Sequence, residues 1–416
     1  MTIGIVGLGY VGLPLAVAFA EAGERVVGVD RSAERVAALR AGHSHVEDVP
    51  DERLAALSAQ IEIADGYAAL TAADAILICV PTPLSANREP DLGPLDAAAA
   101  DLGRVLRAGQ LVALESTTYP GTTRERLAPA LEAGSGLRAG TDFALAYSPE
   151  RVDPGRADHT VRTTPKVVGG LTPACTERAV AAYRTIVDDV VAVSTPEVAE
   201  LSKLLENIFR SVNIALVNEL AILAHRMGID IWEVVDAAAT KPFGFMPFQP
   251  GPGMGGHCLP VDPFYLAWRA REYDFPTEFV ELAGKVNQEM PQFCVERVAR
   301  ALNDAGSAVR GADVLVLGVA YKPGVADTRE SPALKIIAGL LERGAAVSYH
   351  DPHVPDLPRA GLHSRPLDAA LAAADIAVVV TAHPELDYAD IASRVPRLLD
   401  LRGVTRGIDA AGVERL

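Results

Sequence analysis

Three closely spaced glycines near the start of the chain have the spacing of a phosphate-binding turn. Gly7, Gly9 and Gly12 follow a short apolar run, Ile3 to Val6, and open a helical pattern. In this setting the first glycine permits a tight turn, the second lets a pyrophosphate approach the backbone, and the third lets helix and strand pack closely. The helix N-terminus adds N–H groups and a positive dipole end. The motif predicts a dinucleotide site; the alternative is a glycine-rich turn without a ligand.

An acidic residue follows this turn at a suitable distance. Asp30 ends a second apolar run and lies 18 residues beyond Gly12. A carboxylate at that point accepts hydrogen bonds from ribose hydroxyls, which favours NAD over NADP. Arg31 and Arg35 lie nearby, and one of them could hold a 2′-phosphate instead.

Cys258 lies in the glycine-rich loop GMGGHCLPVD. The glycines would let a substrate approach, and Pro260 can begin a helix, which would place the thiol near a helix N-terminus and lower its pKa. Asp262 would be close if a helical turn forms. The alternative is a small buried cysteine, but the loop favours a nucleophile. His257 could be a base, although its side chain should point away from that of Cys258.

Polar residues on a long helical pattern form a third group. Lys203 and Asn207 lie between Pro196 and Gly228, and their i,i+4 spacing puts them on one helix face. By spacing alone, a solvated face with an ordinary lysine is the simpler interpretation.

Three more polar segments, VPTP, ESTTYPGTT and YSPERVDPG, follow apolar runs and contain Thr82, Thr117 and Glu150. Ligands of open α/β sheets bind beyond the carboxyl ends of strands, so these side chains are placed to face a cofactor. The alternative is ordinary turn chemistry, since Ser, Thr and Pro are common in loops.

The elements that would position these residues divide the chain into three regions. Strand patterns alternate with helical patterns over 1–192, and again over 303–416, and each region predicts a parallel sheet with helices on both faces. Between them, 193–302 contains the long helix, which suggests a domain connector or a dimer seam, and a second helix from Glu278 to Ala301. The predicted fold class is α/β, with two Rossmann-like doubly wound domains joined by a helical domain with one long central helix.

Composition excludes several classes of function. The 416 residues are 49% hydrophobic and 22% charged, as in soluble globular proteins. Against 54 Asp and Glu there are 38 Lys and Arg, giving a net charge of −16, which disfavours nucleic-acid binding. Four scattered cysteines predict neither a disulfide framework nor a metal site, and a reducing cytoplasm fits them best. We expect no transmembrane span and, because a basic leader is absent, no secretory signal.

Seven motifs in order make the chain similar to the nucleotide-sugar 6-dehydrogenases, the UDP-glucose and GDP-mannose dehydrogenase family. They are GLGYVGLP, CVPTP, ESTTYPGTT, SPERVDPG, ELSKLLEN, GGHCLPVDP and YKPGVADTRESP, and they span nearly the whole chain. The wording of three of them most resembles the branch that acts on UDP-N-acetylglucosamine and UDP-N-acetylmannosamine.

The resemblance implies two successive NAD-dependent oxidations at C6 of a sugar, with Cys258 as the nucleophile that forms a thiohemiacetal and then a thioester. Lys203 and Asn207 would stabilise the developing alkoxide, Asp262 would help move protons, and Glu150, with Thr117, would activate the hydrolytic water. The implied cofactor contacts are Gly7, Gly9, Tyr10, Val11, Gly12, Asp30, Arg35, Thr82, Thr117 and Arg329. The implied substrate contacts are Glu150, Arg151, Lys203, Asn207, Gly255, Tyr321 and Lys322.

The resemblance also implies a homodimer through the long helix and a tail domain that carries the UDP moiety. The tail lacks GxGxxG, so we expect no second NAD site there. Two positions depart from the family pattern: Val261 and Pro323 stand where lysine is common. UDP-glucose is an alternative substrate. One competing function is a two-electron dehydrogenase of the 3-hydroxyacid or 6-phosphogluconate type, which would have no use for Cys258 or for the tail domain. The other is a non-catalytic NAD-binding regulator.

Overall fold

The computed structural model describes residues 1–85, 87–151, 160–256 and 259–416. These residues form two compact units. The first contains Met1–Glu206 and Phe264–Phe275, and the second contains Asn207–Pro263 and Pro276–Leu416. The long helix α7 (Pro196–Met227) contributes residues to both units. The fold class predicted from the sequence, α/β with a long central helix, is confirmed.

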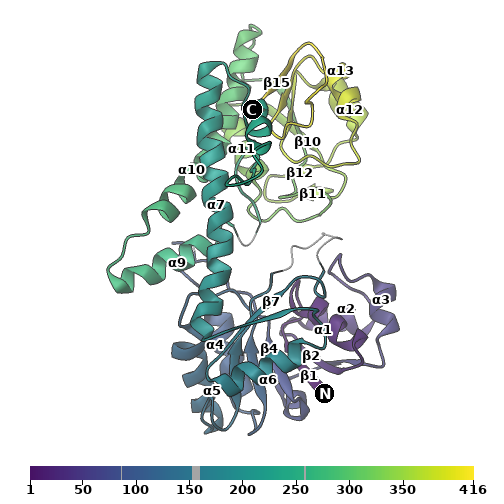
Figure 1. The fold of residues 1–416 in the computed structure, drawn as a ribbon. Helices are drawn as coiled ribbons and strands as arrows, with labels where there is room; N and C mark the ends of the chain where they lie inside the picture. The colour runs from purple at the N-terminus through teal and green to yellow at the C-terminus, as the bar shows by residue number, and fades with distance from the viewer. Residues whose placement is uncertain (86, 152–159, 257–258) are drawn as a thin grey trace. The chain divides into compact units, whose positions relative to one another are not determined.

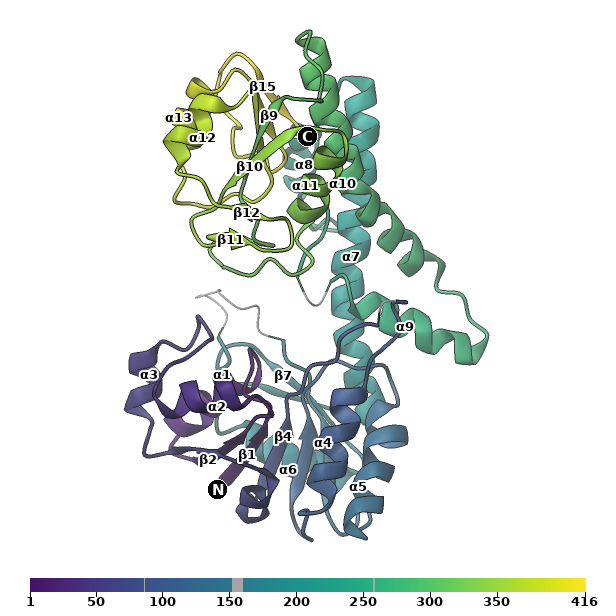
Figure 2. The ribbon, with the colours of Figure 1, turned by 180° about the vertical axis from the view of Figure 1, so that it is seen from behind.

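The first unit is built on an eight-stranded sheet with the order β3-β2-β1-β4-β5-β6-β7-β8. Helices α1 and α6 share one hydrophobic core with the sheet, while α4 and α5 pack against each other (Figures 1 and 2). The strands are β1 (Thr2–Val6), β2 (Arg25–Val29), β3 (Ile61–Ala64), β4 (Ala75–Ile78), β5 (Leu111–Leu114), β6 (Ala144–Tyr147), β7 (Lys166–Gly170) and β8 (Val190–Val193). The helices are α1 (Gly12–Glu21), α2 (Ala33–Arg40), α3 (Asp51–Ala56), α4 (Gly93–Gly103), α5 (Ala128–Ser135) and α6 (Pro173–Tyr183), together with α9 (Asp262–Ala270) from Phe264 onward.

The direction of the last two strands was not apparent from the sequence. Strands β1 to β6 are parallel, but β7 pairs antiparallel with β6, with Ala146 opposite Gly170. Strand β8 then runs parallel to β7. An apolar run buried in a sheet looks the same whichever way it runs, so the pattern carries no information about direction. The reversal brings the start of β7 next to the loop that follows β6.

The second unit is built on a five-stranded parallel sheet with the order β10-β9-β13-β14-β15. Alternate residues of β9 face opposite sides: Val314 and Val316 pack with α10 and α11, whereas Leu315 and Leu317 pack with α12 and α13. The strands are β9 (Asp313–Leu317), β10 (Ala346–His350), β13 (Ile376–Val379), β14 (Leu398–Asp400) and β15 (Val413–Arg415), with a small hairpin of β11 (Asp356–Leu357) and β12 (Leu362–His363). The helices are α8 (Ile231–Ala239), α10 (Glu278–Asp304), α11 (Pro332–Glu342), α12 (Leu367–Ala373) and α13 (Tyr388–Arg394).

Helix α7 is the one described helix that is long and apolar enough, by length and composition, to cross a membrane. Of its most apolar window, 33% is buried inside the protein. Three polar residues along it, Glu200, Asn207 and Asn218, are at most 1% exposed. A long core helix of a soluble protein passes the same test, and these polar side chains hydrogen-bond to other parts of the chain.

Candidate active site

The N-terminal glycine motif has the geometry of a cofactor cradle. Gly7 has φ +93°, and a Cβ added there would lie 2.7 Å from the carbonyl oxygen of Cys79. A Cβ on Gly12 would lie 1.8 Å from the carbonyl oxygen of Gly7. A Cβ on Gly9 would meet no atom within 4 Å. The first and third glycines are therefore required by the protein's own packing, and the second leaves open space beside the backbone, where a pyrophosphate fits.

Asp30 is hydrogen-bonded to the turn that forms this cradle. Its carboxylate accepts hydrogen bonds from the N–H groups of Leu8 (2.8 Å) and Ser32 (2.9 Å) and from Nη1 of Arg35 (2.9 Å). Burial alone would raise the pKa of Asp30, but these hydrogen bonds outweigh it, so the pKa is lowered and the group stays ionised. Since Arg35 is already paired with Asp30, this arrangement suits the ribose hydroxyls of NAD better than a 2′-phosphate.

Two further residues lie beside this cradle. Tyr10 is 43% exposed and contacts His45 edge-on, with ring centroids 6.4 Å apart. Both ring nitrogens of His45 are buried, and neither has a hydrogen-bond partner among the described residues. Val11, half-buried, is the residue before α1. Sequence reasoning did not select His45, because it lies in a polar stretch without periodicity.

The loops after β4 and β5 are joined to each other. Thr82 Oγ1 donates a hydrogen bond to the carbonyl oxygen of Thr117 (2.7 Å), and Ser116 Oγ donates to that of Val80 (2.6 Å). Tyr265 of α9 adds a third link, from its hydroxyl to the carbonyl oxygen of Thr82 (2.9 Å). The carboxyl ends of neighbouring parallel strands meet at one edge, which is why residues 35 apart in sequence come together.

Glu200 holds the next part of the β5 loop against α7. Its carboxylate accepts from the N–H of Gly121 (2.7 Å) and from both the N–H (2.9 Å) and the hydroxyl (2.7 Å) of Thr123. The side chain is fully buried, and burial outweighs these hydrogen bonds and raises its pKa to about 7. Sequence reasoning did not select Glu200, although it lies three residues before Lys203.

Lys203 is 8% exposed and makes no hydrogen bond or ion pair with any residue that the structure describes. The solvated-face interpretation is therefore wrong. A buried ammonium without a partner is costly, so Lys203 is suited to a partner supplied by a ligand.

Asn207 and Asp262 lie in direct contact within the second unit. Asn207 Nδ2 donates a hydrogen bond to Asp262 Oδ2, and Arg210 donates to Oδ1 of Asn207. Asn207 is 1% exposed and Asp262 is 2% exposed. Asp262 is the first residue of α9, which begins two residues later than the helix that Pro260 was expected to begin.

Cys258 and its neighbour His257 lie outside the described residues, but the glycines before them do not. A Cβ on Gly255 would lie 2.9 Å from Cβ of Tyr321, and a Cβ on Gly256 would lie 2.9 Å from the Tyr321 ring. Gly256 N–H also donates to the carbonyl oxygen of Arg329 (3.3 Å). These two glycines therefore pack directly on the first loop of the tail sheet, and only glycine fits at their positions.

Two charged residues of that tail loop, Arg329 and Lys322, contact neighbouring side chains of the same loop. The Arg329 guanidinium pairs with Asp327, with Nη2 and Oδ2 at 2.7 Å. Lys322 Nζ lies 5.8 Å from the centroid of the Tyr321 ring. The predicted substrate residues Gly255, Tyr321 and Lys322 are thus neighbours, and the cofactor role predicted for Arg329 stays a prediction.

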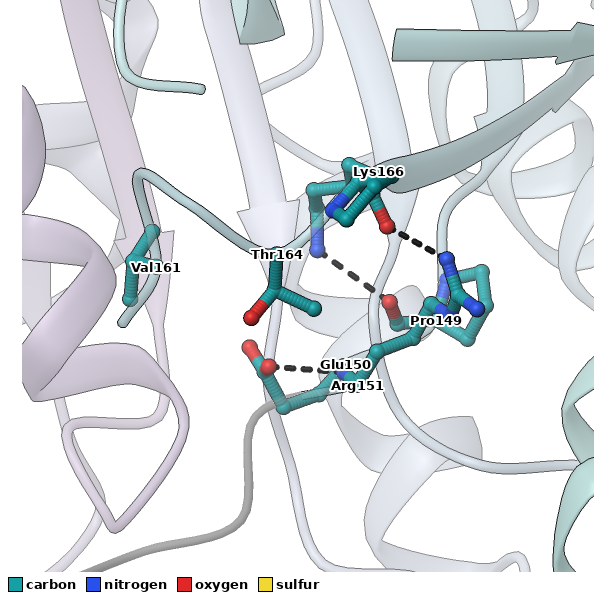
Figure 3. Close-up of a pocket in the computed structure, with 7 residues that line it drawn as sticks. Pro149, Glu150, Arg151, Val161, Thr164 and Lys166 are labelled. Carbon is teal, nitrogen blue, oxygen red and sulfur yellow. Dashed lines mark hydrogen bonds between the residues drawn. The ribbon is translucent and has the colours of Figure 1, made fainter. Parts of the chain in front are cut away.

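Glu150 and Arg151 line a small pocket in the first unit (Figure 3). Arg151 N–H donates to Oε1 of Glu150 (2.7 Å), and the Arg151 guanidinium pairs with Glu206 of α7 at 2.8 Å. The other residues lining the pocket are Pro149, Val161, Thr164, Pro165 and Lys166.

One group of described residues, His353, His383 and Glu385, has side-chain atoms close enough to share a metal ion. Both ring nitrogens of His383 are already engaged, one with Asp351 Oδ2 (3.1 Å) and the other with the N–H of Gly324 (3.3 Å). A metal would have to displace one of these hydrogen bonds, so the group is better explained as a structural network.

Models of one protein family match the chain along its length. They are the NAD-binding, central and UDP-binding domains of the UDP-glucose/GDP-mannose dehydrogenase family, matching residues 1–187, 197–289 and 315–407. The chain belongs to the UDP-glucose/GDP-mannose dehydrogenase family. This membership confirms the predicted family, the NAD cofactor and the predicted activity: the protein is an NAD-dependent nucleotide-sugar dehydrogenase that acts on a UDP-sugar.

Relatives and solved structures in this dehydrogenase family resemble nearly the full chain. UDP-N-acetyl-D-mannosamine dehydrogenase of Pyrococcus horikoshii is 39% identical over 92% of this chain and 90% of that protein. UDP-N-acetyl-D-glucosamine 6-dehydrogenase of Pseudomonas aeruginosa is 39% identical over 85% and 83%, respectively. The solved structure of the UDP-D-ManNAc dehydrogenase from P. horikoshii has a TM-score of 0.91 at 35% identity and covers 100% of this chain and 98% of that one.

Proposed function

We propose that this dehydrogenase oxidises the C6 alcohol of a UDP-N-acetylhexosamine to the carboxylate. Per sugar, the alcohol, two NAD⁺ and one water would give the carboxylate, two NADH and three protons. The names of the two relatives above, which act on UDP-N-acetylmannosamine and UDP-N-acetylglucosamine, support this class of substrate. UDP-glucose is the alternative sugar, because a UDP-glucose dehydrogenase structure from Pyrobaculum islandicum resembles the chain with a TM-score of 0.89 at 31% identity.

The contact between Asn207 and Asp262 carries the proposal of a two-step reaction. It joins a polar side chain of α7 to the residue that lies four positions after Cys258 in the sequence, which supports a shared role for the amide, the carboxylate and the cysteine motif. A simple two-electron dehydrogenase has no use for a cysteine there.

The chemistry can be divided among residues of this chain. NAD, when bound, supplies a hydride acceptor for each oxidation at C6. Lys203 and Asn207 stabilise the oxyanion that develops on the C6 oxygen. The Cys258 thiolate adds to the aldehyde carbon to give a thiohemiacetal, which becomes a thioester after the second oxidation. Asp262 relays protons.

The remaining roles concern hydrolysis and binding. Glu150, with Thr117 beside it, takes a proton from the water that cleaves the thioester. Arg151, Gly255, Tyr321 and Lys322 contact the nucleotide sugar. The cofactor contacts are those of the glycine motif with Asp30, Arg35 and Thr82, and Arg329 from the tail.

The three regions predicted from the sequence have separate tasks in this proposal. Residues 1–192 bind NAD, 193–302 carry the catalytic lysine and cysteine, and 303–416 bind the UDP moiety. The matches to the three family domains support this division. The shared core of the later part of α7, α8, α10 and the tail sheet supports close packing between part of the second region and the third region.

We infer that α7 also forms the interface of a homodimer. Large apolar side chains that are 44% to 64% exposed repeat along it every three or four residues. The one longer interval, of seven residues, contains the half-buried Val212. The exposed side chains are Val198, Leu201, Leu205, Phe209, Leu216, Leu220, Leu223 and Met227. This spacing keeps them on one face of a straight helix, and an uncharged stripe of this length suits a second copy of the same helix.

We also propose that the protein is cytoplasmic and has no membrane or nucleic-acid partner. The net charge of −16 disfavours binding to phosphate backbones. Glu200 and Asn218, buried and hydrogen-bonded inside the two units, suit a helix of a soluble enzyme better than one in lipid.

The decisive experiment is the number of NADH formed per molecule of sugar nucleotide. The panel is UDP-N-acetylglucosamine, UDP-N-acetylmannosamine, UDP-N-acetylgalactosamine, UDP-glucose and GDP-mannose. We expect about two NADH per sugar with an N-acetylhexosamine. About two with UDP-glucose only would establish the alternative sugar. About one would remove Cys258 from the mechanism, and none, with NAD still bound, would favour a non-catalytic regulator.

A further inference from the structure

We propose that Lys166 is a positioning residue for Glu150 in the hydrolysis of the thioester. Lys166 would act from inside the first unit, through the backbone immediately before Glu150, together with its buried partner Glu115. This inference rests on the proposed function, because it assigns Lys166 to one step of that reaction.

Lys166 and Glu115 form an ion pair in the interior. Lys166 Nζ lies 2.7 Å from Oε2 of Glu115, and the two side chains are 6% and 0% exposed. The hydroxyl of Tyr183 donates to the other oxygen of Glu115. Glu115 follows β5, and Lys166 opens β7, so the antiparallel turn of β7 is what brings the two charges together.

The ammonium reaches beyond its carboxylate partner. Lys166 Nζ also donates to the carbonyl oxygen of Pro149 (3.2 Å), the residue before Glu150. On the other side of Glu150, Arg151 donates from Nη1 to the carbonyl oxygen of Pro165. Figure 3 shows both links between the two segments, with the Glu150 side chain to one side of them, near Thr164. The backbone that carries Glu150 is therefore fixed on both sides.

Charge couples the same residues. Burial lowers the pKa of the Lys166 ammonium, but the charges of Glu115 and Glu150 outweigh it, so its pKa lies above the ordinary value. An ion pair that served stability alone would be a poor choice here, because apolar residues of similar volume usually do as well in a protein interior. The hydrogen bond from Lys166 to the Pro149 carbonyl oxygen lets the ion pair hold the backbone beside Glu150, which apolar residues could not do.

The step that needs this precision is the hydrolysis. The water oxygen forms a bond to C6, the bond from C6 to Sγ of Cys258 breaks, and the sulfur leaves as a thiolate. The water's proton passes to the Glu150 carboxylate, which must lie within hydrogen-bond reach of that water. A displacement of about 1 Å can cost roughly a hundredfold in rate. Loosening the Pro149 peptide should therefore slow hydrolysis and leave the two oxidations nearly unchanged.

The test compares Lys166→Met with wild-type enzyme. After rapid mixing with NAD and the sugar nucleotide, we expect the variant to release its first two NADH per site at nearly the wild-type rate. Its steady-state kcat should then fall about tenfold to a hundredfold. KM should fall with it, because the earlier steps that set kcat/KM are unchanged. Intact-mass analysis after acid quench should show a larger fraction of acylated enzyme than in wild type.

Two further variants keep this test interpretable. Lys166→Met leaves Glu115 buried without its partner, so the double variant with Glu115→Gln removes both charges and preserves the fold; it should accumulate acyl-enzyme equally. Gln110→Met is the matched control. Gln110 is fully buried, donates to the carbonyl oxygens of Leu70 and Ala73, and lies at the opposite end of β5. It should lower stability without accumulating acyl-enzyme.

The outcomes separate this inference from the proposed function. If wild-type enzyme fails to form two NADH per sugar, the proposed function is wrong. If wild type forms two, and the Lys166 variants show no extra acyl-enzyme or lose the first oxidation equally, the positioning role is wrong. Partial recovery of the hydrolytic rate in Lys166→Arg, which keeps a donor, would support it further.

Discussion

Asp30 and Asp351 hold the same place in the two sheets of this protein. Each follows the second strand of its unit, and each accepts hydrogen bonds from N–H groups of the turn after the first strand: Asp30 from Leu8, and Asp351 from Val319 and Ala320. The remaining partners differ. Asp30 pairs with half-exposed Arg35. Asp351 pairs with His383, and the side chains of Asp351 and His383 are both 0% exposed.

This difference explains why two similar sheets have different tasks. In the first sheet, the carboxylate has a partly exposed partner, Arg35, and lies beside an open glycine cradle. In the second sheet, the equivalent carboxylate is enclosed, and the turn reads GVAYKPG, without the second and third glycines of the motif. The tail sheet therefore keeps the topology of a dinucleotide-binding domain but uses its acidic residue as an internal support.

Replacing Asp30 should weaken NAD binding. Hydrogen bonds to a charged group are worth about 1.5–3 kcal/mol, so Asp30→Ala should raise the Kd for NAD by roughly 10- to 100-fold. Isothermal titration calorimetry would measure the Kd for NAD of the wild type and the variant. Asp65→Ala, which removes an exposed carboxylate paired with Arg40 in the same unit, is the control and should leave the Kd unchanged. An unchanged Kd in Asp30→Ala would show that this carboxylate does not contact the ribose.

Asp351 should stabilise the second unit in a pH-dependent way. Burial would raise its pKa, but the hydrogen bond from His383 and the N–H donors lower it from 3.8 to about 2. Because the folded pKa is depressed, the stabilisation is fully present above pH 4 and is lost as the pH falls through 2. The ionised Asp351 carboxylate should add about 2 kcal/mol to the free energy of unfolding.

Calorimetric unfolding of wild type and Asp351→Asn would measure this effect. The wild type should be the more stable at pH 7, and the difference should shrink between pH 4 and pH 2. NAD affinity should not change, in contrast to Asp30→Ala. A difference that stayed constant over this pH range would contradict the assignment.

Cys258→Ser should separate cofactor binding from turnover. A serine hydroxyl is a far weaker nucleophile than a thiolate at neutral pH, so net formation of the acid should stop while NAD binds normally. Carboxylate product would be measured by mass spectrometry and NAD binding by calorimetry. Cys294→Ser, at a fully buried cysteine in α10, is the control and should keep the activity of whatever fraction folds. Normal acid production by Cys258→Ser would rule out the covalent route.

Charges introduced on the apolar stripe of α7 should prevent formation of the proposed homodimer. Leu205 and Leu216 are 64% and 57% exposed, so Leu205→Lys and Leu216→Lys should cost the monomer little stability. Each would place a charge in the interface, which is strongly unfavourable without a partner. Light scattering coupled to size exclusion should report a monomer. Leu341→Lys, at a 41% exposed leucine of α11, is the matched control and should remain dimeric. A wild-type monomer would refute the dimer itself.

Sequence reasoning was most successful where the signal was local. The glycine motif, Asp30 and the strand-helix alternation each depend on residues within about 25 positions, and hydrophobic periodicity reports those relations directly. The bounds of the first strand were close to the pattern: the apolar run extends from Ile3 to Val6, and β1 is Thr2–Val6. The long helix was expected from Pro196 to Gly228 and ends at Met227.

The same reasoning failed where burial decided the answer. The i,i+4 spacing of Lys203 and Asn207 is compatible with a solvated face or a buried one, and only the packing of α7 shows that both are buried. Glu200 and Lys166 were not selected, because a charged residue in a sequence gives no sign that it will be enclosed.

The amino-acid sequence by itself determined the family, the fold class, the cofactor cradle and the identity of the candidate nucleophile, since each is written in contiguous motifs. Tertiary structure alone decided which distant side chains meet: Asn207 with Asp262, Glu200 with the turn at Gly121, and Lys166 with Glu115. The first two contacts depend on the packing of α7 against its neighbours, and the third depends on the reversal of β7. Both arise from the free energy of burying whole elements against one another, which no local stretch of sequence encodes.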